Sequence, residues 1–337
     1  MRYPEFLKEK NTIGLVAPSF GACGSPYGLR YDKAVELFQE LGYSIKAVEH
    51  VNVLVEGQSA SPLERANGFM NMYEDRNIDF VWSVCGGEKE LQVLPYIDFD
   101  KIKNLPPKYF MGYSDNTTLA FTLTTIADVA SIYGDHIIDF GVNNWEGCLE
   151  NAYQLIQGKK LKHDAFPLIQ LNDLKREQPF FGYNLEFPNE WKNINSESVD
   201  VQGRIIGGCL DVLVGMCGTR FDNVEEFADK YQEDGIIWYV EPCELNPFGT
   251  MRALWQLKEA NWFKHVKAFL IGRPNNPDDL MDYSHEMAVR EILGDFNVPI
   301  ITEFDTGHVA PTIPIIDGSI AHVVNNKEEH TIEFILK

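Results

Sequence analysis

The chain has 337 residues, of which 45% are hydrophobic and 23% are charged, and this composition is ordinary for a globular protein large enough for two domains. Its formal net charge is −21, from 29 lysines and arginines against 50 aspartates and glutamates. This excess of negative charge argues against binding to nucleic acid or to an anionic membrane surface, because both are themselves negatively charged.

Residues 1–8 contain no apolar run of the kind found in a signal peptide, and no segment approaches the roughly 20 apolar residues that cross a bilayer. The six cysteines are dispersed without a Cys-x-x-Cys pair, which favours reduced thiols over a disulfide framework. We therefore expect a cytoplasmic protein. No metal-ligand spacing such as His-Glu-x-x-His is present, so we expect neither a metal nor a cofactor.

Apolar strands and amphipathic helices alternate along the first part of the chain. The pattern predicts strands over 12–18, 44–48, 80–84 and 109–112, and helices over 29–41, 61–73 and 116–127. Such alternation is typical of a parallel sheet in an α/β domain.

The alternation weakens over 158–201, which is polar, irregular and interrupted by prolines. Beyond it the pattern predicts strands over 202–208, 235–241, 266–271 and 299–303, helices over 209–216, 251–260 and 284–294, and a closing hairpin over 320–336. We therefore expect an N-terminal α/β domain over 1–160, a linker or insert over 161–200, and a second domain over 201–337.

The segment Gly112-Tyr113-Ser114-Asp115 joins a predicted strand directly to a predicted helix. A serine at this corner presents its hydroxyl at the carboxyl end of the strand, beside the free N–H groups of the helix start, which is the geometry that a nucleophile needs. The alternative is that Ser114 or Asp115 only caps the helix.

Three further segments end predicted strands. Gly86 and Gly87 follow the strand over 80–84, and their N–H groups, with that of Asp115, could form an oxyanion hole; the alternative is a plain turn. Glu241 ends an apolar strand, or is a surface carboxylate in a turn. His308 follows the last strand in Gly-His-Val-Ala-Pro, or is an ordinary loop histidine.

Ser114, Glu241 and His308 together have the composition of a catalytic triad, which occurs on unrelated folds in any chain order. In that role Ser114 attacks a carbonyl, His308 takes and returns the proton, and Glu241 orients the histidine. The main rival for the base is His136, which stands beside Asp135.

These segments together resemble the serine peptidase family of the LD-carboxypeptidases and the microcin C immunity peptidases. The family is marked by Gly-Tyr-Ser-Asp, an upstream Gly-Gly turn, a Leu/Val-Glu strand end and Gly-His-x-x-Pro near the C-terminus. The chain carries these motifs in order at 112–115, 86–87, 240–241 and 307–311, with further likeness at 13–19, 94–98 and 206–210. It departs from many relatives at Glu88-Lys89, where they have Tyr-Gly or Tyr-Asn, and at Pro242-Cys243-Glu244.

The resemblance implies a parallel-sheet α/β domain followed by a smaller β-rich α/β domain, a Ser114–His308–Glu241 triad and an oxyanion hole from Asp115, Gly86 and Gly87. It also implies a homodimer and no metal or cofactor.

Asn189-Glu190-Trp191 is similar to a segment of the immunity branch, in which an aromatic residue stacks on a nucleotide base. We therefore expect cleavage of the amide between an acidic aminoacyl or peptidyl group and a nucleotide-like moiety. The alternative enzyme releases terminal D-alanine from muropeptides. Trp191 could equally anchor the loop, and Glu244 and Arg252 are further candidates for substrate binding.

Two other classes of protein stay open. One is a non-catalytic module that binds a small molecule, in which Ser114 is only a helix cap. The other is a nucleotide-dependent enzyme that uses Gly86 and Gly87 to hold a phosphate. A binding module would form no covalent adduct at Ser114 with a serine-directed phosphonate. A nucleotide-dependent enzyme would show thermal stabilisation by nucleotide that survives Ser114→Ala and disappears when Gly86 is changed.

Overall fold

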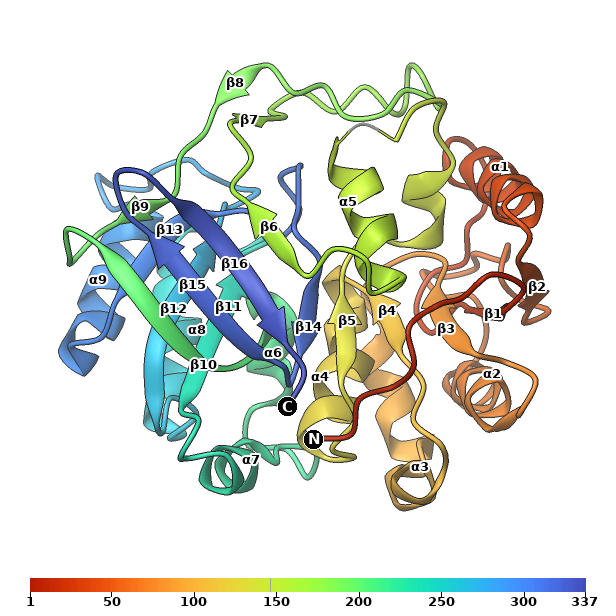
Figure 1. Ribbon diagram of the computed structural model, residues 1–337, viewed down its shortest axis with the longest axis horizontal. Helices are drawn as coiled ribbons and strands as arrows, with labels where there is room; N and C mark the ends of the chain where they lie inside the picture. The colour runs from red at the N-terminus through yellow and green to blue at the C-terminus, as the bar shows by residue number, and fades with distance from the viewer. Residues whose placement is uncertain (146) are drawn as a thin grey trace. The chain divides into compact units, whose positions relative to one another are not determined.

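The computed structural model describes residues 1–145 and 147–337, which form two compact units (Figure 1). The N-terminal unit comprises Met1–Lys160 and Asn172–Asn184, and the C-terminal unit comprises Leu161–Leu171 and Leu185–Lys337. Each unit is therefore built from two separate stretches of the chain.

The N-terminal unit is organised around a parallel sheet in the order β5-β4-β3-β1-β2. Its strands are β1 (Thr12–Val16), β2 (Ser44–Ala47), β3 (Phe80–Ser83), β4 (Phe110–Gly112) and β5 (Ser131–Tyr133). Because all these strands run the same way, their carboxyl ends meet at one edge, where ligands bind in open α/β sheets.

The helices predicted over 29–41, 61–73 and 116–127 are present, together with helices that the sequence pattern did not predict. The helices of this unit are α1 (Tyr27–Glu40), α2 (Pro62–Glu74), α3 (Phe99–Asn104), α4 (Thr117–Thr125), α5 (Gly147–Ile156) and the short 3₁₀ helices η1 (Glu90–Tyr96), η2 (Ser114–Asn116) and η3 (Ile137–Phe140). The start of α2 shows why the pattern predicts it: Ser61 caps it, Glu64 completes a capping box and Pro62 occupies the first turn. Phe38 of α1 packs edge-on against Trp82 of β3 with 5.3 Å between ring centroids, so the helix is fixed on the sheet by aromatic contacts.

The C-terminal unit contains an eight-stranded mixed sheet in the order β6-β16-β15-β10-β11-β12-β13-β9. Its strands are β6 (Lys162–Asp164), β9 (Lys192–Asn193), β10 (Val199–Cys209), β11 (Ile236–Glu241), β12 (Val266–Gly272), β13 (Ile300–Phe304), β15 (Ile320–Asn325) and β16 (His330–Ile335). The central strands β10 to β13 are parallel and the outer pairs are antiparallel. In Figure 1 the long strands β10, β15 and β16 run side by side.

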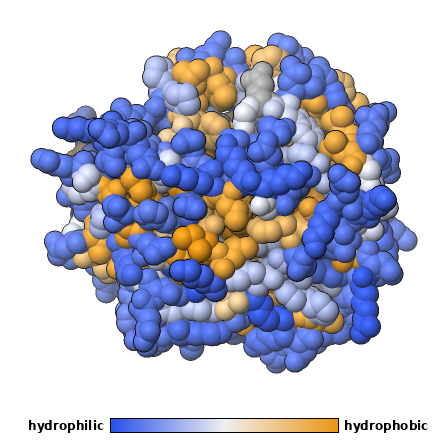
Figure 2. Space-filling view, viewed as in Figure 1, coloured by the Kyte–Doolittle hydropathy of each residue, from blue (hydrophilic) through white to orange (hydrophobic). Residues whose placement is uncertain are grey.

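The remaining elements of this unit are short. They are the hairpin β7 (Leu168–Ile169) and β8 (Phe187–Pro188), the strand β14 (Ile315–Asp317), the helices α6 (Leu210–Met216), α7 (Val224–Lys230), α8 (Pro247–Glu259) and α9 (His285–Leu293), and the 3₁₀ helix η4 (Gly294–Phe296). No helix among the described residues is both long and apolar enough to cross a membrane. Hydrophilic side chains cover most of the face seen in Figure 2, with apolar patches between them.

The predicted fold class, a parallel α/β domain followed by a β-rich α/β domain, is confirmed by this architecture. Two elements begin three or more residues earlier than predicted, and the other predicted boundaries differ by at most two residues. The helix predicted over 251–260 begins at Pro247, because Asn246 caps it by accepting the N–H of Gly249. The strand predicted over 202–208 begins at Val199, since its polar first half pairs with β15. The predicted domain limits stay predictions.

Candidate functional site

Ser114 lies at the corner between β4 and α4, as predicted. Its φ of +64° is uncommon for a residue other than glycine, and a conformation of this kind costs on the order of 1–3 kcal/mol unless its surroundings enforce it. Ser114 donates its N–H to the hydroxyl of Tyr133 at 3.2 Å, and its carbonyl accepts from Thr117 at 2.7 Å. The backbone on both sides of the hydroxyl is therefore held in a strained turn, which is the geometry of a nucleophile elbow.

The Gly86-Gly87 turn lies directly against Ser114. A Cβ added at Gly86 would stand 3.1 Å from the Cβ and 3.3 Å from the Oγ of Ser114, so a larger residue here would press on the serine. Gly87 has a φ of +152°, and a Cβ there would overlap the hydroxyl of Ser19 at 2.2 Å. The turn that carries the candidate oxyanion donors is therefore packed against the side chain of Ser114.

The side chain of Asp115 has a separate, structural task. It is buried and accepts hydrogen bonds from the hydroxyl of Ser19 and from the N–H of Glu90, the latter at 2.8 Å. Burial raises the pKa of Asp115, and these hydrogen bonds oppose the shift. Asp115 therefore ties together the loops that follow β1, β3 and β4 at the carboxyl edge of the sheet.

His136, the rival for the base, is committed to the local structure. Its Nε2 lies 2.9 Å from Oδ1 of Asn116 and 3.2 Å from the carbonyl oxygen of Tyr113, and its ring stacks on Tyr113 with 4.3 Å between centroids. A carbonyl can only accept, so Nε2 carries the proton and donates. A nitrogen in that state cannot take a proton from a serine, and His136 is better explained as part of the elbow's support.

Glu241 and His308 form a close pair in the C-terminal unit. Glu241 ends β11 and is fully buried, and Nδ1 of His308 lies 3.0 Å from its Oε1 and 3.1 Å from its Oε2. Since Nδ1 donates to the carboxylate, Nε2 of the neutral histidine is the acceptor. The pair has the geometry of a base oriented by an acid.

The electrostatics of the pair follow from its burial. Burial lowers the pKa of His308, but the Glu241 carboxylate and the Cys243 thiol outweigh this effect and hold that pKa well above its ordinary value. Two glycines close in on Glu241: a Cβ at Gly272 or at Gly307 would approach an atom of its side chain to 2.7 Å. Glu241 is therefore enclosed on two sides by backbone that only glycine allows.

The loop that carries His308 is fastened by a buried ion pair. Arg273 contacts Asp305 at 2.6 Å and donates to the carbonyls of Val309 and Pro311 at 2.7 and 2.6 Å. Both charged side chains are almost fully buried. The pair therefore fixes both ends of the short loop around His308, a task that the sequence pattern did not reveal.

The three predicted substrate-binding residues lie on separate elements of the C-terminal unit. Trp191 precedes β9 and is buried; its indole N–H donates to Asp305 at 2.8 Å and its ring packs on Phe304. Glu244 and Arg252 are exposed, on the loop after β11 and on α8 respectively. The environment of Trp191 is that of an anchor, and its stacking on a base stays a prediction.

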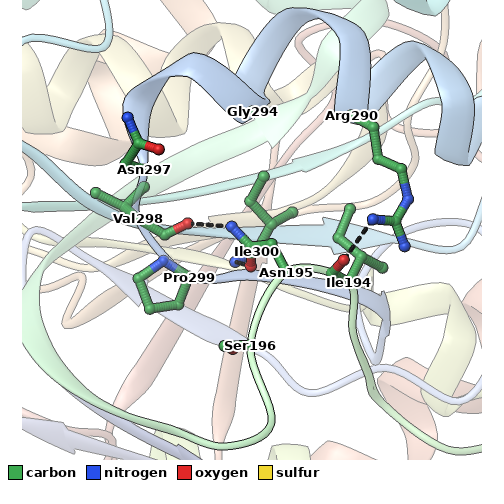
Figure 3. Close-up of a pocket in the computed structure, with 9 residues that line it drawn as sticks. All are labelled: Ile194, Asn195, Ser196, Arg290, Gly294, Asn297, Val298, Pro299 and Ile300. Atoms are coloured by element: carbon green, nitrogen blue, oxygen red, sulfur yellow. Dashed lines mark hydrogen bonds between the residues drawn. The ribbon is translucent and has the colours of Figure 1, made fainter.

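A cavity of about 490 Å³ lies elsewhere in the C-terminal unit, between the segment after β9 and the start of β13 (Figure 3). Its walls are largely bonded to each other: Asn195 donates to the carbonyl of Val298 at 2.7 Å and accepts from the N–H of Ile300 at 3.0 Å, and Arg290 donates to the carbonyl of Ile194. None of the candidate catalytic residues lines it. The cavity is therefore separate from the candidate catalytic residues.

Two family models match the chain. The LD-carboxypeptidase N-terminal domain matches residues 13–134 and the LD-carboxypeptidase C-terminal domain matches residues 202–323, which together are more than half of the chain. Each match contains one half of the geometry described above, with Ser114 in the first and the Glu241–His308 pair in the second.

Individual relatives agree with the family models. The "Probable murein peptide carboxypeptidase" of Bacillus subtilis is 23% identical over 341 residues, covering 98% of this chain and 94% of the relative. The microcin C7 self-immunity protein MccF of Escherichia coli is 24% identical over 326 residues, covering 90% and 88%. The solved structure of MccF in complex with aspartyl sulfamoyl adenosine matches with a TM-score of 0.83 at 20% identity, covering 100% of this chain and 99% of that chain.

The fold and these matches define a hydrolase, a serine-type carboxypeptidase or amidase. The chain belongs to the LD-carboxypeptidase family of serine peptidases, which also includes MccF.

Proposed function

We propose that Ser114, His308 and Glu241 form the catalytic triad of a serine peptidase of the microcin C immunity type. The observation that carries the proposal is the 3.0 Å contact between Nδ1 of His308 and the fully buried carboxylate of Glu241. A buried carboxylate beside Nδ1 holds the histidine in the tautomer whose Nε2 accepts a proton. The proposal requires that Nε2 of His308 reach the hydroxyl of Ser114 in the active enzyme.

The chemistry follows from these roles. Ser114 Oγ attacks the carbonyl carbon of the amide while His308 Nε2 takes the hydroxyl proton, and the carbonyl oxygen becomes an oxyanion. The N–H groups of Asp115 and of the Gly86-Gly87 turn receive that oxyanion. Collapse of the intermediate breaks the C–N bond, and His308 gives its proton to the leaving nitrogen. His308 Nε2 then takes a proton from a water molecule whose oxygen attacks the acyl carbon, and it gives this proton to Oγ of Ser114 as the ester bond breaks and the acid product leaves.

For the substrate we propose an amide that joins an acidic aminoacyl or peptidyl group to a nucleotide-like moiety. The likeness to MccF over 90% of the chain supports this choice. Because Trp191 is buried and bonded to Asp305, we assign it to anchoring the Asn189-Glu190-Trp191 segment. An exposed aromatic ring elsewhere would then have to meet the base.

The second candidate is a carboxypeptidase that releases terminal D-alanine from muropeptides. It is favoured by the likeness to the murein relative, which extends over 98% of the chain. Both candidates use the same triad and differ only in the groups on each side of the scissile amide. We also propose a cytoplasmic homodimer, and light scattering after size-exclusion chromatography measures the assembly directly.

The test compares two substrates, aspartyl sulfamoyl adenosine and a tetrapeptide stem that ends in D-alanine. Each is incubated with the wild type, with Ser114→Ala and with Ser44→Ala, a control that removes an exposed hydroxyl on β2. We expect hydrolysis of the nucleotide conjugate by the wild type and the control, and its loss in Ser114→Ala. Cleavage of the stem peptide alone would select the second candidate, and turnover that survives Ser114→Ala would refute the triad.

A further inference from the structure

A chain of buried polar side chains runs behind Ser114 within the N-terminal unit. Nδ2 of Asn116 donates to Oε2 of Glu90, and Oδ1 of Asn116 lies 2.9 Å from Nε2 of His136. Glu90 and Asn116 are fully buried and His136 almost so. The proposed reaction uses none of these three side chains, although each would cost free energy to bury without partners.

Glu90 performs a capping task that is normally local. Asn116 occupies the N-cap position of α4, where its side chain would ordinarily accept an N–H of the first turn, but it makes no such bond. Instead Oε1 of Glu90, 26 residues away in sequence from Asn116, accepts the N–H of Leu119 at 3.2 Å. This arrangement frees Asn116 to bridge Glu90 and His136.

The carboxyl groups of Glu90 and Asp115 interact with one positively charged side chain, that of Arg65. Burial, and then the neighbouring Asp115 carboxylate, raise the pKa of Glu90 well above its ordinary value, while Arg65 opposes the shift. Arg65 is itself buried and fixed by the carbonyls of Pro18 and Lys89 at 2.6 and 3.1 Å. One buried arginine thus interacts electrostatically with both carboxyl groups, those of Glu90 and Asp115.

The His136 end of this row of buried polar side chains reaches the residues that flank Ser114. His136 donates to the carbonyl of Tyr113 and stacks on its ring, and a Cβ added at Gly86 would lie 3.3 Å from Cε1 of His136. The space for Asn116 depends on Gly112, where a Cβ would overlap Oδ1 of Asn116 at 2.4 Å. The row of polar side chains therefore contacts Tyr113, the residue before the proposed nucleophile, and Gly86 of the candidate oxyanion turn.

We propose that Glu90, Asn116 and His136 are positioning residues that hold Ser114 in its strained conformation and keep the Gly86-Gly87 turn against it. The order of donors is fixed from the His136 end: the carbonyl of Tyr113 can only accept, so Nε2 donates, Oδ1 of Asn116 accepts, and Nδ2 is left to donate to the carboxyl group of Glu90. The inference rests on the proposed role of Ser114 as nucleophile.

This fixed order allows an exchange test. Both oxygens of Glu90 accept hydrogen bonds, so Glu90→Gln sets an amide NH₂ against a donor in either orientation, the NH₂ of Asn116 or the N–H of Leu119. Asn116→Asp sets two carboxyl groups against each other. The double variant, Glu90→Gln with Asn116→Asp, restores one donor facing one acceptor and leaves an oxygen for His136. We expect each single substitution to lower both kcat and the rate at which a fluorophosphonate labels Ser114 by about tenfold or more, and to change KM by no more than about threefold. The double variant should recover most of the lost activity and labelling.

The control is Ile78→Ala, which removes a buried side chain just before β3 and outside the polar chain. If the polar chain acted only through overall stability, labelling would follow the melting temperature equally in Ile78→Ala and in the two single variants. Ring ¹⁵N shifts of His136 give a second readout, because the Nε2–H tautomer should change in the single variants and return in the double variant.

Two outcomes would overturn the inference: labelling of the single variants at the wild-type rate, or losses in the double variant that equal the product of the single losses. Both leave the proposed function intact as long as the wild type is labelled at Ser114. Loss of the proposed function would look different, since the wild type would then fail to label at Ser114 at all.

Discussion

Replacement of Glu241 by glutamine tests how much the buried carboxylate contributes to catalysis. The substitution keeps the shape of the side chain and removes its charge, 3.0 Å from Nδ1 of His308. Coulomb's law at an effective dielectric constant of about 20 gives an attraction of about 5.5 kcal/mol between the carboxylate and an imidazolium at this distance. Since about 1.4 kcal/mol corresponds to a tenfold change in rate, we expect kcat to fall by about 10⁴.

The assay is the dependence of kcat/KM on pH for the wild type and Glu241→Gln. His308 must be neutral to act as a base, and its raised pKa means that wild-type activity is lost as pH falls through a value above that of an ordinary histidine. Without the carboxylate the pKa of His308 should fall, so the acidic limb should move to lower pH while the plateau drops.

An exposed pair in the same unit provides the control. Nε2 of His322 lies 2.8 Å from Oδ1 of Asp200, but the two side chains are 37% and 77% exposed. Asp200→Asn should change kcat by less than about twofold, because solvent screens an exposed pair. The reasoning is refuted if Glu241→Gln retains wild-type kcat, or if its acidic limb moves to higher pH.

Three further predictions concern buried or closely packed residues of the two units. Burial raises the pKa of Asp135 to about 7, so the Asp135 carboxyl stays protonated in the folded state while it ionises near pH 4 in the unfolded state, and the stability of the protein falls as pH rises from about 4 to 7. Asp135→Asn should therefore raise the melting temperature at pH 8 more than at pH 5. An equal change at both pH values would contradict this account. Gly307→Ala should abolish most activity, because the added Cβ would lie 2.7 Å from Oε2 of Glu241. The control is Gly218→Ala: this glycine also has a positive φ but lies in open space, so the substitution should lower stability and leave kcat unchanged. Arg273→Met leaves a buried carboxylate without its partner and should lower the free energy of unfolding by about 3–5 kcal/mol in urea titration; a loss below about 1 kcal/mol would show that the pair does not hold the loop.

The fold class was predictable because strand and helix periodicities are local properties of the sequence. Ser114 was predictable for a similar reason: it stands at a strand-to-helix junction that Gly112 opens. The candidates Glu241 and His308 were visible because each follows an apolar strand, and His308 is flanked by glycine and proline.

The supports of the site were not predictable, since they depend on residues far apart in the sequence. Glu90 looks like one more charge in a Glu-Lys-Glu run, and only the tertiary structure buries it beside Asn116. The Arg273–Asp305 pair spans two loops and has no local pattern. Trp191 could be predicted only as either an anchor or a stacking surface, because a tryptophan in a polar segment is compatible with both.

The central claim is that Ser114 is the nucleophile, and the most direct measurement is the site of covalent modification by a fluorophosphonate. Intact-protein mass spectrometry and peptide mapping should find one adduct per chain, on Ser114, with loss of activity in proportion to labelling. The variant Ser114→Ala should take up no label. Complete labelling of Ser114 with full retention of hydrolysis, or inactivation by an adduct on another residue, would contradict the account.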